Sequence, residues 1–106
     1  MSAGGWIGVD LDGTLAEYGG WNIGAPVPAM LERVRSWLAE GTSVKCFTAR
    51  AGLVEMAVPV RAWLDALGLQ DVGITNVKDF GMVELWDDRA VRVVMNTGER
   101  CCEPTP

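Results

Sequence analysis

The chain contains no histidine among its 106 residues. Without an imidazole, Ser-His catalytic triads, histidine general bases and most zinc or iron sites are excluded. Only three cysteines occur, and two of them are adjacent (Cys101 and Cys102), so we expect neither a disulfide framework nor a cysteine-rich zinc site. No apolar run approaches the ~20 residues of a membrane-spanning helix, and no signal-peptide pattern opens the chain. These absences predict a cytoplasmic protein with no membrane partner.

Basic residues are also few. Nine Lys and Arg stand against 14 Asp and Glu, which gives a formal net charge of -5. This balance argues against broad binding to a nucleic-acid backbone, although a local basic pocket stays open. Hydrophobic residues make up 49% of the chain, which excludes a disordered protein. The length suits a single domain over residues 1–106, with residues 99–106 as a loose tail.

Short apolar runs alternate with amphipathic segments along the chain. The runs predict five strands, and the segments between them predict two helices, one opened by Pro28 and one over residues 53–67. Pro59 predicts either a late start near Met56 or a kink in the second helix. The glycine-rich residues 16–27 predict a loop. The expected strands are residues 6–11, 43–47, 71–75, 83–86 and 91–95. The alternation predicts an α/β fold with a parallel sheet and helices on both faces.

Polar side chains follow four of the expected strands, at the point where each strand ends. Ligands of open parallel sheets bind at the carboxyl ends of the strands, so these side chains are expected to meet at one edge. The candidates are Asp10 and Asp12, Thr48 and Arg50, Asn76 and Lys78, and Asp87 and Asp88.

The four aspartates of this set require a partner of opposite charge. Two unit charges ~4 Å apart repel by about 4 kcal/mol at an effective dielectric of ~20. Such a cluster persists if it binds a cation or becomes protonated, and oxygen ligands without Cys or His suit Mg²⁺. Lys78, the Thr48 hydroxyl and the N–H groups of Gly13 and Thr14 are suited to hold a phosphoryl group. The set predicts phosphoryl transfer through an aspartyl-phosphate.

Four short motifs carry a resemblance to a known family. Residues 10–15, Asp-Leu-Asp-Gly-Thr-Leu, resemble the first motif of the haloacid dehalogenase-like hydrolases, in their phosphatase branch. Thr48 in residues 47–50, Lys78 in residues 75–79 and the Asp87-Asp88 pair in residues 85–89 resemble the second, third and fourth motifs. All four occur in the order that the family has, and they span nearly the whole chain.

The resemblance implies a role for each matched residue. Asp10 would be the nucleophile and a Mg²⁺ ligand. Asp12 would protonate the leaving group and then activate water, while its backbone carbonyl binds the metal. Thr48 and Lys78 would hold the phosphoryl group, and Asp87 and Asp88 would complete the Mg²⁺ site.

The family fold implied by the same resemblance is a Rossmann-like, three-layer arrangement whose five-stranded parallel sheet is ordered 5-4-1-2-3. Because residues 15–28 are too few for a cap domain, we expect a capless member, whose open site a second subunit of a homo-oligomer could cover. The sequence of residues 47–50 and 85–89 is also similar to that of the phosphatase part of phage-type polynucleotide kinases. That likeness implies a nucleotide or a nucleic-acid 3′-phosphate as substrate.

Other interpretations stay open at this point. Thr48 could simply cap a helix, and Lys78 could be an exposed loop residue. Arg50 fits a salt bridge as well as a contact with substrate. Tyr18 and Trp21, in the glycine-rich loop, could stack on a base or pack within the loop. The alternative functions are a phosphoacceptor or phosphate-binding regulatory domain without turnover, and a phosphotransferase.

Overall fold

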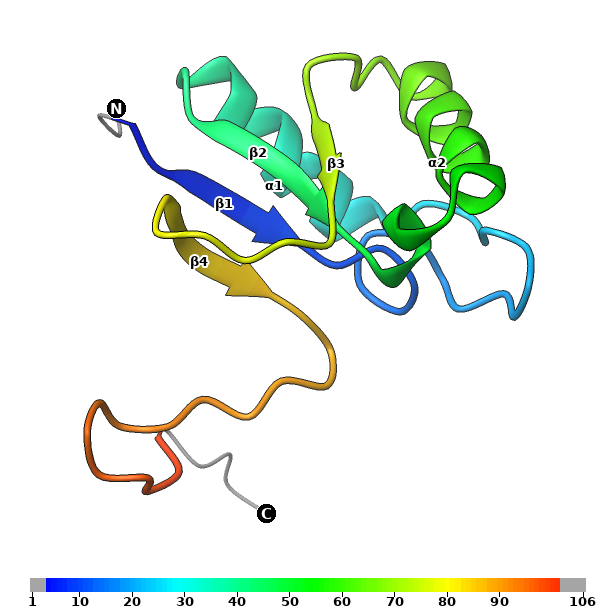
Figure 1. Cartoon of the computed structure of the whole chain (residues 1–106). Helices are drawn as coiled ribbons and strands as arrows, with labels where there is room; N and C mark the ends of the chain where they lie inside the picture. Colours follow the sequence, from blue (N-terminus) through cyan, green and yellow to red (C-terminus); the bar gives the residue numbers. More distant parts are fainter. Residues whose placement is uncertain (1–3, 102–106) are drawn as a thin grey trace.

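The computed structural model describes residues 4–101 of the chain, so Cys102 and most of the tail expected from residue 99 lie outside the described residues. Four strands form one sheet in which every neighbouring pair is parallel. The strands are β1 (Trp6–Val9), β2 (Ser43–Phe47), β3 (Gly73–Thr75) and β4 (Met82–Trp86). The order β3-β2-β1-β4 confirms the predicted neighbours of the first four strands (Figure 1).

Two α-helices connect the first three strands. Helix α1 (Pro28–Ala39) begins at a proline. The N–H groups of the first helical turn have no partner within the helix, so a proline, which lacks an N–H, loses no hydrogen bond there. Helix α2 (Val54–Ala66) follows a 3₁₀ turn, η1 (Ala49–Gly52), and contains Pro59 in its interior. Helix α2 therefore begins at Val54, two residues before the predicted start near Met56, and it continues through Pro59.

Both helices pack on the same face of the sheet. Met30 and Val34 of α1 and Val60 and Leu64 of α2 lie in a single buried cluster with side chains of β1 and β2. Right-handed crossovers from β1 to β2 and from β2 to β3 step in the same direction along the sheet, which puts both helices on one face. The prediction of helices on both faces, and so of three layers, is therefore wrong for residues 4–101, which form two layers.

A tryptophan and a turn cover the sheet on the side away from the helices. Trp6 is 5% exposed, and its indole N–H donates to Asp79 Oδ1 over 2.9 Å. The Lys45 ammonium lies 4.6 Å from the centre of its ring. A Cβ on Gly81 would lie 3.0 Å from the same ring, so a larger residue there would require the ring or the turn to shift. The hydrogen bond from Trp6 also lowers the pKa of Asp79.

The predicted fifth strand at residues 91–95 is wrong. No such strand occurs among the described residues, and the segment after β4 leads away from the sheet (Figure 1). Asn96 and Gly98 have positive φ angles of 69° and 76°, which turn the chain back on itself. Val94 N–H then donates to Glu99 O over 2.7 Å, so the segment pairs with residues 99–101 instead of with β4. No helix of the described part has the length and apolar character needed to cross a membrane.

Candidate functional site

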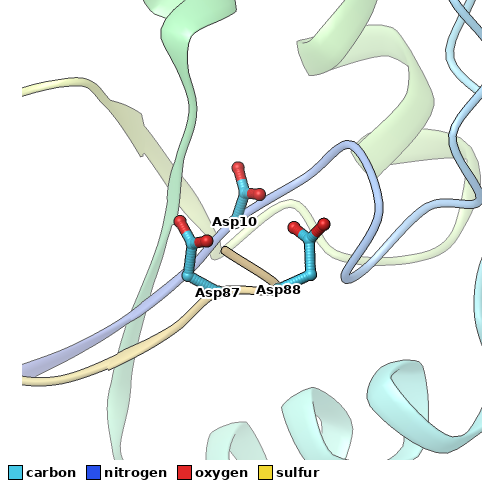
Figure 2. Close-up of side chains that lie close together, drawn as sticks. All are labelled: Asp10, Asp87 and Asp88. Carbon is cyan, nitrogen blue, oxygen red and sulfur yellow. The ribbon is translucent and has the colours of Figure 1, made fainter. Parts of the chain in front are cut away.

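The pairing of β1 with β4 brings two distant aspartates together. The two strands run parallel with Val9 opposite Trp86, and the N–H of Asp10 donates to Trp86 O over 2.8 Å. The next residues along both strands, Asp10 and Asp87, therefore leave the sheet side by side. Each of Asp10, Asp87 and Asp88 offers one carboxylate oxygen, and these atoms all lie within 4.8 Å of one another (Figure 2). We refer to these three residues as the acidic cluster.

Burial and mutual repulsion make the charged form of Asp10 in the acidic cluster unfavourable. The pKa of Asp10 is raised to about 6, most of all by burial and in addition by the neighbouring carboxylates of Asp87 and Asp88. Within residues 4–101 the ion pairs involve other carboxylates, those of Asp12 and Asp65. The chemistry of three convergent carboxylates without Cys or His fits a hard divalent cation such as Mg²⁺.

Local hydrogen bonds fix the two acids that follow β4. Asp87 Oδ1 accepts the N–H groups of Arg89 (2.7 Å) and Ala90 (3.2 Å). Asp88 Oδ1 accepts the Thr14 hydroxyl over 3.2 Å. Gly13 has a φ of 91°, and a Cβ there would lie 2.8 Å from Asp88 Oδ2. The Gly-Thr pair within the first motif therefore makes room for Asp88 and binds it.

The backbone of the same Gly-Thr pair does not have the role expected from the sequence. The N–H of Gly13 donates to Ala16 O over 2.8 Å, and that of Thr14 donates to Leu11 O over 3.2 Å. Both groups thus close a turn, and in this geometry they are engaged before any phosphoryl oxygen arrives. The structure gives Thr14 a contact with Asp88 instead.

Asp12 lies two residues after Asp10, but its side chain points to a different partner. Arg50 Nε donates to Asp12 Oδ2 over 2.8 Å, and Nη2 donates to Oδ1 over 2.9 Å. This bidentate pair raises the pKa of Arg50 above its already high ordinary value. Arg50 was expected to form either a salt bridge or a contact with substrate, and the structure shows a salt bridge. The Asp12 carboxylate is not part of the acidic cluster.

Arg50 also contacts the loop between β1 and α1. Its Nη1 donates to Trp21 O and its Nη2 to Gly20 O, each over 3.0 Å. Arg50 is 8% exposed, which is unusual for an arginine and follows from these four hydrogen bonds. We call residues 17–25 the aromatic loop, because they carry Tyr18 and Trp21.

Thr48 both caps a helix and lies in the site. Its hydroxyl oxygen accepts the N–H of Arg50 over 3.1 Å at the start of η1. Its own N–H donates to Thr75 O over 2.9 Å, which fixes the end of β2 to the end of β3. Thr48 is 3% exposed and lines the same cavity as the acidic cluster. It therefore caps η1 and also lies where the sequence predicted.

Lys78 is exposed in the segment between β3 and β4. It follows the carboxyl end of β3 as expected, but it does not line the cavity that contains the aspartates. Of the eight candidates, six line this cavity and two do not; the six are Asp10, Asp12, Thr48, Arg50, Asp87 and Asp88, and the two are Asn76 and Lys78.

An open cavity of about 870 Å³ lies at this edge of the sheet. Its lining combines the aspartates with apolar and aromatic side chains, and two of the aromatic ones, Tyr18 (71% exposed) and Trp21 (87% exposed), lie at the surface, at the mouth of the cavity. Sequence reasoning did not place five of the lining residues here: Gly20, Phe47, Ala49, Met56 and Arg89. Phe47, Ala49 and Arg89 lie within the matched motifs, which was a usable signal, whereas nothing in the sequence marks Met56.

No family model matches this chain. No curated protein matches it either. One solved structure is similar, a conserved protein coded by a locus from Bacteroides thetaiotaomicron, with a TM-score of 0.68 and 24% identity over 80% of this chain and 76% of that one. At this level of identity the likeness supports the fold alone.

Proposed function

We propose that this protein is a Mg²⁺-dependent phosphatase that hydrolyses a phosphomonoester through an aspartyl-phosphate on Asp10. The observation that carries the proposal is the acidic cluster, where residues from opposite ends of the chain offer oxygens within 4.8 Å of one another. Bound there, Mg²⁺ would neutralise the carboxylates and the phosphate that approaches them. The likeness of four motifs to the haloacid dehalogenase-like hydrolases supports the same assignment.

The proposed reaction has two steps. Asp10 attacks phosphorus, the bond to the leaving oxygen breaks, and that oxygen takes a proton from Asp12. Asp12, now ionised, then takes a proton from water, and the hydroxide attacks the phosphorus of the aspartyl-phosphate to release inorganic phosphate and free Asp10. The Arg50–Asp12 ion pair corresponds to the ionised form of Asp12 that the second step needs. The Thr48 hydroxyl would donate to a phosphoryl oxygen.

The substrate we propose is a nucleotide or the phosphorylated end of a nucleic acid. Tyr18 and Trp21 are large, exposed and placed at the mouth of the cavity, where they are available to stack on a base. Stacking of one base on an aromatic side chain contributes ~1–3 kcal/mol. The site is open, as expected for a chain without a cap domain, and so has room for a bulky leaving group.

Purified protein tests the proposal directly. With Mg²⁺ it should hydrolyse a generic aryl phosphate, lose that activity in EDTA, and regain it when Mg²⁺ is restored. Nucleotides and 3′- and 5′-phosphorylated oligonucleotides then identify the leaving group. Absence of turnover on this whole panel with Mg²⁺ present would remove the proposal.

A phosphoacceptor or phosphate-binding regulatory domain is the second candidate. It would use the same acidic cluster with slow turnover, and it is favoured because Lys78 lies outside the cavity lining and the N–H groups of Gly13 and Thr14 are engaged, which leaves fewer groups to stabilise the transition state of hydrolysis. Treatment with acetyl phosphate separates the two candidates. A phosphoprotein that lasts for hours supports the regulatory domain, and rapid release of phosphate supports the phosphatase.

A further inference from the structure

We propose that Arg50 is a positioning residue that couples the aromatic loop to the Asp12 carboxylate, so that loss of either contact releases the other. The proposal concerns a contact between two parts of the chain and is testable without turnover. Its kinetic consequence rests on the proposed phosphatase function.

The two ends of the aromatic loop are held independently of Arg50. Glu17 N–H donates to Ala25 O over 2.7 Å, next to a β-bridge between Ala16 and Pro26. The indole N–H of Trp63 in α2 donates to Gly24 O over 3.1 Å. These contacts fix where the loop leaves and rejoins the body of the protein, but they do not reach its tip.

The tip of the loop is held by Arg50. The carbonyl oxygens of Gly20 and Trp21 each accept a hydrogen bond from the guanidinium over 3.0 Å. Trp21 belongs to this tip, Tyr18 lies two residues before Gly20, and both aromatic residues line the cavity. The place of the aromatic side chains at the mouth of the site therefore depends on where the Arg50 guanidinium lies.

The place of the guanidinium depends in turn on Asp12. Arginine is planar and presents its N–H groups in a fixed fork, so one edge meets the Asp12 carboxylate while the other meets the two carbonyls. Arg50 is nearly buried, and a buried cation without its carboxylate is strongly unfavourable. Removal of the Asp12 charge is expected to move Arg50 towards water and so to free the loop tip.

Chymotrypsin cleavage after Tyr18 and Trp21, two exposed aromatic residues of the loop, tests the coupling on the full chain. Arg50→Ala should increase the rate of this cleavage at least tenfold, since two charge-assisted hydrogen bonds that hold the loop are lost. Asp12→Asn, which never touches the loop directly, should also increase it several-fold. Arg50→Lys, whose ammonium cannot reach acid and carbonyls together, should fall between wild type and Arg50→Ala. Unchanged hydrogen exchange of β2 amides in each variant establishes that the fold is intact.

Arg61→Ala is the matched control. Arg61 also pairs with a carboxylate, Asp65, and donates to two carbonyls, those of Leu69 and Val72, but it lies away from the aromatic loop. Its removal should leave the rate of cleavage after Tyr18 and Trp21 unchanged. If Asp12→Asn leaves the loop as protected as in wild type while Arg50→Ala exposes it, the two contacts are independent and the proposal is overturned. Wild-type protection in Arg50→Ala or Arg50→Lys overturns it as well.

Kinetics provide a second readout where the phosphatase is active. For a nucleotide substrate, Arg50→Lys should raise KM several-fold more than it changes kcat, because the aromatic side chains are displaced while a positive charge near Asp12 remains. For a small phosphate ester without a ring, KM should change little. Equal effects on both substrates would show that the aromatic loop is not what Arg50 positions. If the protein proves not to be a phosphatase, the proteolysis result still tests the coupling.

Discussion

Asp10 and Asp12 are two residues apart, yet they lie in opposite electrostatic surroundings. Asp10 faces Asp87 and Asp88 and has a pKa raised to about 6, first by burial and then by these neighbours. Asp12 faces Arg50 in a bidentate ion pair. The same short motif thus places one carboxylate among other carboxylates and the other against a guanidinium. The first arrangement has the chemistry to accept a cation, whereas in the second the carboxylate is already paired.

The largest expected difference between the two acids is in catalysis. Asp10→Asn should abolish hydrolysis of an aryl phosphate, because an amide is a poor nucleophile and forms no stable acyl phosphate. Asp12→Asn should slow turnover by about 10²–10⁴-fold, the usual contribution of general acid–base catalysis. Steady-state rates with saturating Mg²⁺ measure both. Equal residual activity in the two variants would contradict the division of roles.

The two substitutions should shift stability in opposite directions. Asp12→Asn leaves the nearly buried Arg50 without its carboxylate, and we expect a loss of about 2 kcal/mol in the free energy of unfolding. Asp10→Asn removes charge repulsion and should stabilise the protein at neutral pH by about 1 kcal/mol, after allowance for solvent screening. Urea unfolding in EDTA gives both values. A destabilised Asp10→Asn variant would show that the acidic cluster is not under repulsion.

The pH dependence sharpens this comparison. Because the folded pKa of Asp10 is raised from 3.8 to about 6, the folded state binds more protons than the unfolded state between those values. The stability contributed by this group is fully present below about pH 4 and is lost as the pH rises through about 6. Without divalent cations, the stability advantage of Asp10→Asn should therefore grow across this interval. An advantage that is constant from pH 4 to pH 7 would contradict the shift.

A substitution at Gly13 tests how the acidic cluster is built. Gly13→Ala places a Cβ 2.8 Å from Asp88 Oδ2 in a backbone conformation that alanine rarely adopts. We expect a loss of about 1–2 kcal/mol in stability and weaker binding of Mg²⁺. Thermal unfolding with and without Mg²⁺ measures both effects. Gly20 also has a positive φ, of 70°, but open space around its Cβ, so Gly20→Ala is a control for backbone strain alone.

The sequence predicted most of the acidic site because that site follows from parallel pairing. Once β1 and β4 are neighbours, Asp10 and Asp87 must leave the sheet together, whatever the loops do. The single-faced helix layer was also accessible, since right-handed crossovers and the order β1-β2-β3 require it. To predict this layer, one further step was needed: the segments before and after β4 had to be recognised as too short to contain a helix that would cover the other face of the sheet.

Other features could not be predicted because they depend on loop geometry. The partners of Arg50 lie on the aromatic loop and on Asp12, and no periodic pattern encodes them. The valine-rich residues 91–95 have the composition of a strand, but the turn at Asn96 and Gly98 gives them a local partner. Composition therefore identified the tendency to pair but not the partner.

Calorimetric titration with Mg²⁺ at pH 7.5 tests the central claim most directly. We predict that wild type and Asp12→Asn each bind one Mg²⁺, since the Asp12 carboxylate lies outside the acidic cluster, and that Asp10→Asn binds none. Binding of Mg²⁺ to Asp10→Asn with the affinity of wild type would contradict the account, because the metal would then lie elsewhere on the molecule.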